Sequence, residues 1–121
     1  MVETAYSMQI RPMTIHQEYR VQCYVMELAD AQAINEAIWL QYLKVRDDPG
    51  VRRSHYFEGR YENIYVSEEQ MPALGSVLQA ARHGAQRFLQ QAGMDFSVGF
   101  WMNEMGPGHV TLPHTHDEDD E

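Results

Sequence analysis

The stretch FSVGFWMN, residues 96–103, alternates apolar side chains with small, polar or aromatic ones. A period of two is typical of a strand, because successive side chains point to opposite faces of the sheet. One face would carry Phe96, Val98, Phe100 and Met102. The opposite face would carry Trp101 and Asn103. We therefore expect a strand here, with its apolar face turned to the core.

Two helices are predicted before this strand. The first follows Asp30, a residue type that caps helices, and ends at the Asp-Asp-Pro-Gly sequence of residues 47–50. The second follows a capping box formed by Ser67 and Gln70, has Pro72 in its first turn and ends at Gly93. Their apolar faces would consist of Ile34, Ala37, Ile38, Tyr42 and Val45 in the first helix and of Leu74, Leu78, Ala81, Ala85, Phe88 and Leu89 in the second.

Further strands are predicted on both sides of the first helix and near the C-terminal end. Residues 19–25 alternate in the period of a strand. Residues 55–66 are rich in aromatic and β-branched side chains and form either two short strands with Gly59 as the bend between them or a long aromatic loop. A short return strand is expected at residues 110–112. Residues 1–7 show no periodicity and are expected to be a loose leader.

The chain has 121 residues, of which 44% are hydrophobic, and can close one modest core. We predict a single α+β domain over residues 1–121, with a curved, mostly antiparallel sheet of about four or five strands and two helices on one side. Such a sheet leaves an exposed edge, and pairing of edges or faces between two copies would cover it. A homodimer is therefore expected.

The charge of the chain excludes some partners. The net charge is -9, and five of the 18 acidic residues form an acidic tail at residues 117–121. The nine basic residues are scattered, so we expect no nucleic-acid partner. We also expect no membrane association, because no stretch reaches the ~20 apolar residues of a membrane span. Cys23 is the only cysteine, so no intrachain disulfide is possible, and we predict a cytoplasmic protein.

A possible metal site precedes the acidic tail. His114 and His116 are two residues apart, which places both imidazoles on one side of an extended segment. The pattern W-x-N-E-x3-G-x5-H-x-H of residues 101–116 resembles the uncharacterised branch of the iron(II) and 2-oxoglutarate dependent oxygenases. This resemblance is specific from about Leu74 to His116 and only general before it.

The resemblance implies the leading half of a double-stranded β-helix and a reaction in which 2-oxoglutarate and dioxygen hydroxylate a small-molecule or peptide substrate. His114 and His116 would be iron(II) ligands, and Glu118 is the carboxylate in an alternative His116-x-Glu118 pairing. Two imidazoles and one carboxylate on one face of iron leave three positions for the co-substrate and oxygen. Members of the family continue with a second, distant His and a basic residue that binds 2-oxoglutarate, and these would lie beyond Glu121. We therefore expect oxygenase activity only if that half exists.

Three alternatives stay open from the sequence. Gly108, His114, His116 and Glu121 also match the first signature of the cupins, which bind metal on a related barrel without 2-oxoglutarate. The chain could instead be a non-catalytic binding or interaction protein that keeps the scaffold without the site. A His pair beside an acidic run is also typical of a solvated tail. Other histidines that could complete a metal site are His55, His83 and His109.

Overall fold

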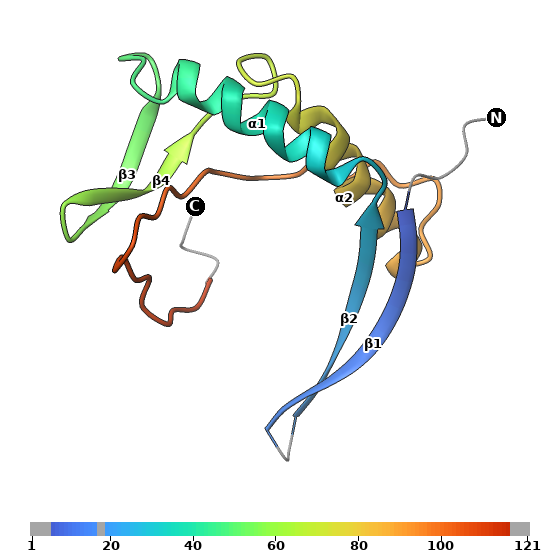
Figure 1. Ribbon diagram of the computed structural model, residues 1–121. Coiled ribbons are helices and arrows are strands. Elements are labelled where there is room, and N and C mark those ends of the chain that lie inside the picture. The colour runs from blue at the N-terminus through green and yellow to red at the C-terminus, as the bar shows by residue number, and fades with distance from the viewer. Residues whose placement is uncertain (1–5, 17–18, 117–121) are drawn as a thin grey trace.

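The structure is a computed structural model that describes residues 6–16 and 19–116 (Figure 1). Within this part of the chain it is a small α+β fold with two helices and antiparallel strands, as predicted. The elements in chain order are β1 (Tyr6–His16), β2 (Tyr19–Leu28), α1 (Ala31–Val45), β3 (Arg52–Phe57), β4 (Arg60–Tyr65) and α2 (Leu74–Phe88).

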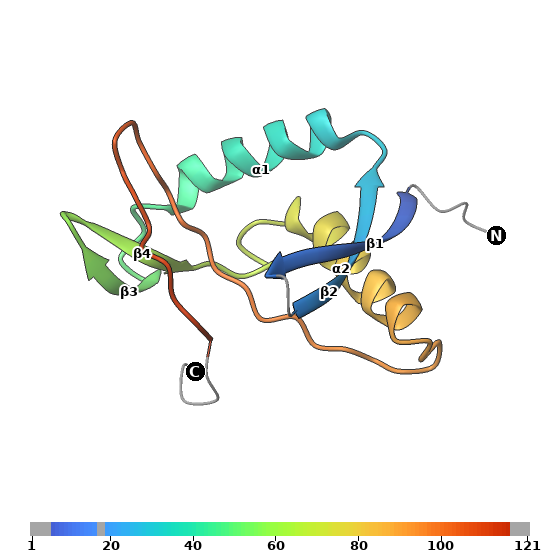
Figure 2. The same cartoon turned by 90° about the horizontal axis from the view of Figure 1, so that it is seen from below.

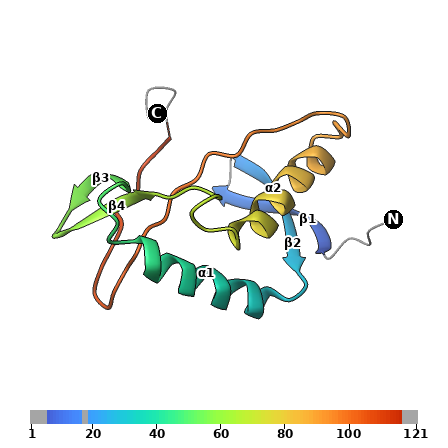
Figure 3. The same cartoon turned by 90° about the horizontal axis from the view of Figure 1, so that it is seen from above.

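The described strands form two separate hairpins. β1 pairs with β2 and β3 pairs with β4, and each pair is a two-stranded antiparallel sheet. Helix α1 extends from one hairpin to the other, and α2 lies beside it at the end nearer to β1 and β2 (Figures 1 and 3). The prediction of one sheet of four or five strands with both helices on one side is therefore wrong. Alternation shows which side chains share a face, but it does not identify the neighbouring strand.

Strand β1 was not predicted, and it begins at Tyr6, inside the range expected to be a loose leader. Its sequence contains Pro12, which lacks the backbone N–H that a central strand needs. In a two-stranded sheet both strands are edge strands, where proline is tolerated. Residues 1–5, the rest of the expected leader, and 117–121, the acidic tail, lie outside the described residues.

The two predicted helix starts have different outcomes. Asp30 precedes α1 as expected, but its φ of 58° is left-handed and its side chain makes no capping hydrogen bond. A capping residue normally has an extended backbone. The box of Ser67 and Gln70 is confirmed, because each backbone N–H donates to the other side chain, at 2.9 and 3.0 Å. It closes a turn before α2, which itself begins at Leu74.

The hairpin at Gly59 is confirmed. Glu58 has φ 48° and Gly59 has φ 85°, so both central residues of this two-residue turn are left-handed. Two positive φ values are the mark of a type I′ turn, whose twist matches that of the flanking strands. The turn sets the register in which Phe57 pairs with Arg60.

Residues 96–103 show the predicted alternation of burial but form almost no sheet. Phe96, Val98, Phe100 and Met102 are partly buried, while Ser97, Gly99, Trp101 and Asn103 are exposed. One antiparallel bridge joins this segment to β4, where Met102 and Ile64 exchange two backbone hydrogen bonds of 2.8 and 2.9 Å. The apolar face is thus correct, and the expected strand is reduced to one bridge.

The core lies where α1, α2, β4 and this segment meet. Helix α2 lies between α1 and the C-terminal stretch (Figures 2 and 3). Met71, in the connection from β4 to α2, is fully buried. The other buried members of the core are Tyr42, Val51, Ile64, Val66, Leu74 and Leu78. Leu89, predicted on the apolar face of the second helix, follows the end of α2 and is 52% exposed.

No helix among residues 6–16 and 19–116 is both long enough and apolar enough to cross a membrane. Both described helices have 15 residues.

Candidate metal site

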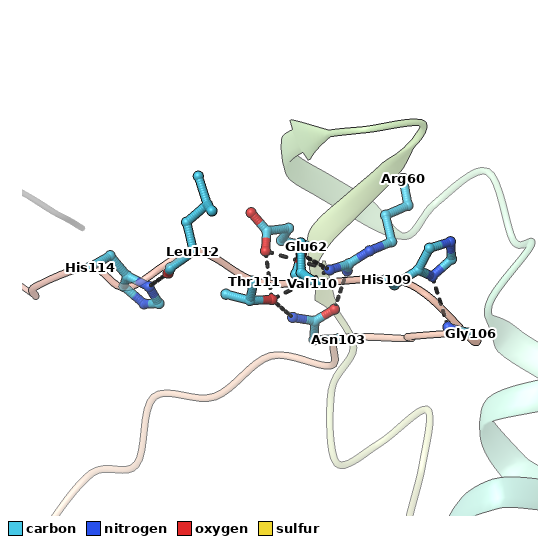
Figure 4. A network of polar contacts seen from close by, with 9 residues as sticks. All are labelled: Arg60, Glu62, Asn103, Gly106, His109, Val110, Thr111, Leu112 and His114. Atoms are coloured by element: carbon cyan, nitrogen blue, oxygen red, sulfur yellow. Dashed lines mark hydrogen bonds and ion pairs between the residues drawn. The ribbon is translucent and has the colours of Figure 1, made fainter.

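Arg60, the first residue of β4, binds the C-terminal segment through hydrogen bonds. Arg60 donates to the side chain of Asn103, to the carbonyl of Val110 at 3.1 Å and to the hydroxyl of Thr111 at 3.3 Å (Figure 4). Glu62 lies 3.6 Å from the guanidinium of Arg60 and accepts a hydrogen bond of 2.8 Å from Thr111. The side chains of Arg60 and Glu62 are only 11% and 20% exposed. This network fixes the position from which the chain continues to the two histidines.

His114 and His116 lie together, as their spacing predicted. Their Nε2 atoms are 3.1 Å apart, and Nδ1 of His114 is 2.8 Å from the carbonyl oxygen of Leu112. A carbonyl only accepts, so the proton of a neutral His114 ring is on Nδ1 and a lone pair is on Nε2. A hydrogen bond from the other ring nitrogen to a carbonyl is the usual support of a metal-binding histidine.

The two histidines border an open groove with a volume of about 680 Å³. The Trp101 and His116 rings stack at a centroid distance of 5.9 Å and an interplanar angle of 29°. The exposed face of the 96–103 segment, predicted to carry Trp101 and Asn103, therefore forms part of the groove. Strands β3 and β4 contribute Arg52, His55, Asn63 and Tyr65.

Tyr65 adds a phenol hydroxyl to this groove. Its hydroxyl is 3.0 Å from the Ser54 hydroxyl and accepts a hydrogen bond of 3.0 Å from the Asn63 amide. The guanidinium of Arg52 lies 4.2 Å from the centre of the Tyr65 ring. The hydrogen bonds with Ser54 and Asn63, with a smaller effect from the Arg52 charge, lower the pKa of Tyr65 below its ordinary value.

His55 is the third described histidine of the groove. Its backbone is left-handed, with φ 59°, although it lies inside β3. Such a backbone is uncommon for a residue with a side chain and is enriched at functional sites. The Nδ1 atom of His55 is 2.7 Å from the Ser54 hydroxyl, so a polar chain connects His55 through Ser54 to Tyr65.

The described residues do not complete a metal site. Within residues 6–16 and 19–116, no three His, Cys, Asp or Glu side chains lie close enough together to hold a metal ion. Glu118, the predicted carboxylate, lies outside the described residues. His109 borders a different cavity, and its Nδ1 accepts a hydrogen bond of 2.7 Å from the backbone of Gly106.

A second polar contact holds the C-terminal segment against α1, and the sequence did not predict it. Glu104 accepts hydrogen bonds from the Tyr42 hydroxyl at 2.6 Å and from Arg46 at 2.7 Å. Burial, and then the bond to Glu104, raise the pKa of Tyr42. A sequence signal existed, because a buried tyrosine on an apolar helix face needs a partner for its hydroxyl. The pattern did not show which residue that partner would be.

No known protein family, curated protein or solved structure matches this chain.

Proposed function

We propose that residues 101–116 form a site for a divalent transition metal, with His114 and His116 as two of its ligands. The contact between their Nε2 atoms carries the proposal, together with the bond that leaves a lone pair on Nε2 of His114. Imidazole nitrogens suit iron(II), zinc and copper.

The separation of the two nitrogens fits this chemistry. With metal–nitrogen bonds of about 2.1 Å, two ligands at right angles are roughly 3.0 Å apart. The structure has 3.1 Å between the two Nε2 atoms, so both rings could bind one ion with little movement. Without metal, the Nε2–H group of His116 donates a hydrogen bond to the Nε2 lone pair of His114. Metal binding would displace that proton, so affinity should fall as pH falls.

Iron(II) with 2-oxoglutarate is the metal and co-substrate that the resemblance favours. In such a protein the two imidazoles and a carboxylate, for which Glu118 is the candidate, would hold the iron and leave positions for 2-oxoglutarate and oxygen. The bridge between Ile64 and Met102 supports placing β4 and the 96–103 segment in a larger sheet, as in the leading half of a double-stranded β-helix. A cytoplasmic location would suit iron(II) and the free thiol of Cys23.

The test is a calorimetric titration with iron(II) without oxygen, with zinc as a second ion. We expect the wild type to bind and the His114→Ala, His116→Ala double variant to bind more than ~100-fold more weakly. Loss of a partner that only orients a ligand already costs about 10–100-fold. The control is His83→Ala, because His83 lies on α2 and not in the groove. Equal affinity of the double variant and the wild type would refute the site.

The co-substrate needs its own measurement. Release of succinate from 2-oxoglutarate in the presence of iron would favour the oxygenase interpretation. Metal binding without that release would favour a cupin-like site.

A non-catalytic interaction protein is the second candidate, and one surface of α1 favours it. Trp39 and Leu40 are 52% and 60% exposed, and Leu43 is 38% exposed. We propose that this face contributes to a homodimer. Sedimentation at micromolar concentration should show a dimer that Leu40→Glu dissociates. Leu89→Glu, at a comparably exposed leucine, should leave it intact. A monomeric wild type would contradict the proposal.

A further inference from the structure

A second cavity, separate from the groove of the histidine pair, lies between the end of α1, the β3–β4 hairpin and the loop at residues 104–109. It has a volume of about 350 Å³. Its polar lining includes Arg46, Arg53, Arg60, Tyr61, Glu104 and His109. Three of the nine basic residues of this chain, whose net charge is -9, therefore line one cavity.

Arg53 is held at this cavity by the main chain. Its guanidinium donates to the carbonyl of Val51 at 2.8 Å and to the carbonyl of Arg46. Two of its five N–H groups are used in this way, which leaves three for a ligand. The two carbonyls fix the direction of the side chain without neutralising its charge. A guanidinium oriented in advance loses less entropy when it binds an anion.

Two of the three arginines at the cavity make ion pairs, and the third does not. Arg46 pairs with Glu104 at 2.7 Å and lies 3.7 Å from Asp47, and Arg60 pairs with Glu62 at 3.6 Å. Arg53, by contrast, makes no ion pair with any residue in the described part of the chain. The three arginines face three carboxylates, those of Asp47, Glu62 and Glu104, so the net charge around the cavity is about zero. The guanidinium of Arg53 is the one of the three without an ion pair, and a single unpaired guanidinium suits an anion with a single charge better than a phosphate dianion.

Further donors and an apolar wall complete the cavity. Nδ1 of His109 accepts from the backbone of Gly106, so the neutral ring carries its proton on Nε2, where it is a donor. Tyr61 adds a hydroxyl group, and Ile64 and Tyr42 add apolar surface. We propose that this cavity binds a small monocarboxylate with an apolar body, whose carboxylate lies against Arg53 and His109. This site does not depend on metal binding by the histidine pair.

The experiment titrates the full chain with sodium benzoate at constant ionic strength, monitored by the amide signals of residues 51–64 and 104–109 in NMR spectra. We expect saturable shifts with benzoate and at least about tenfold weaker binding of benzamide, its neutral counterpart, and of inorganic phosphate. Equal binding of benzamide would mean that the cavity binds only apolar surface. Equal binding of phosphate would mean that the charge is not matched to a monoanion. Either result, or absence of binding, would overturn the proposal.

Arg53 and its neighbour in the sequence, Arg52, provide a test variant and a matched control. Arg53→Gln should weaken benzoate binding about tenfold or more, whereas Arg52→Gln, whose side chain lies over Tyr65 in the other groove, should leave it unchanged. Arg53 also donates hydrogen bonds to two backbone carbonyls, and the loss of these bonds in Arg53→Gln can unfold the protein, so a second variant is needed. His109→Leu keeps those contacts and should weaken benzoate binding several-fold. If neither Arg53→Gln in its folded form nor His109→Leu weakens binding, the proposal is wrong.

Discussion

Replacement of Met71 by alanine is expected to lower the free energy of unfolding by about 2–5 kcal/mol. Met71 is the one side chain of the described core with no exposed surface, and it lies in the connection between β4 and α2. The smaller side chain would lose apolar contacts and leave a cavity that a close-packed core fills only in part. Urea unfolding followed by circular dichroism measures the change.

The control is the same substitution at an exposed methionine. Met105 is 48% exposed, so Met105→Ala should change stability by less than about 0.5 kcal/mol. A loss below about 1 kcal/mol for Met71→Ala would contradict its burial in the core. A loss above about 5 kcal/mol would unfold many small domains, because their total stability is of the order of 5–15 kcal/mol.

Replacement of Glu104 by alanine is expected to give the second large loss. The Tyr42 residue is only 3% exposed, and its hydroxyl would lose the carboxylate that accepts its proton at 2.6 Å. An unsatisfied buried polar group costs about 1–3 kcal/mol, and the lost ion pair with the half-exposed Arg46 adds at most about 1 kcal/mol. Urea unfolding of the variant measures the sum of these two losses in the free energy of unfolding. The segment that leads to the histidine pair would also lose its contact with α1.

Two comparisons separate the contact from a general effect of charge. Asp47→Ala removes a carboxylate that is 93% exposed and 3.7 Å from the same arginine, so its effect should lie within about 0.5 kcal/mol. Tyr42→Phe combined with Glu104→Ala should show a coupling of about 0.5–3 kcal/mol. Additive effects would mean that the hydroxyl and the carboxylate do not interact.

The contact between Tyr42 and Glu104 also makes the stability of the protein depend on pH. Tyr42 is an acid whose folded-state pKa is raised by burial and by Glu104, so folding favours its neutral form. Its contribution to stability is complete below the unfolded pKa of about 10. That contribution is lost as pH rises from there through the folded pKa. Wild type should therefore lose stability above pH 10 more steeply than Tyr42→Phe.

Local patterns predicted much of the fold, and contacts between distant residues were not predicted. The alternation of residues 96–103 gave the correct buried face, and Gly59 gave the correct turn, because both depend on neighbours in the chain. Strand pairing depends on tertiary contacts, so one sheet was predicted where the described residues form two.

In the candidate site, too, the local feature was predicted and the contacts between distant residues were not. The spacing of His114 and His116 predicted that the two rings meet, because residues two apart on an extended segment share a side. The sequence did not predict that Arg60 fastens this segment, since Arg60 and Thr111 are 51 residues apart. Iron(II), 2-oxoglutarate and the role of Glu118 stay predictions.

The stretch at residues 95–101 depends on its side chains for attachment. Its apolar residues are partly buried, but within the described part of the chain its backbone groups make no hydrogen bond to another backbone group. Amide protons there should exchange with solvent quickly, because no ladder must open first. The segment that leads to the histidine pair is therefore held by side-chain packing, by the bridge at Met102 and by the contacts of Arg60 and Glu104, and we expect its backbone to open to solvent more readily than the helices.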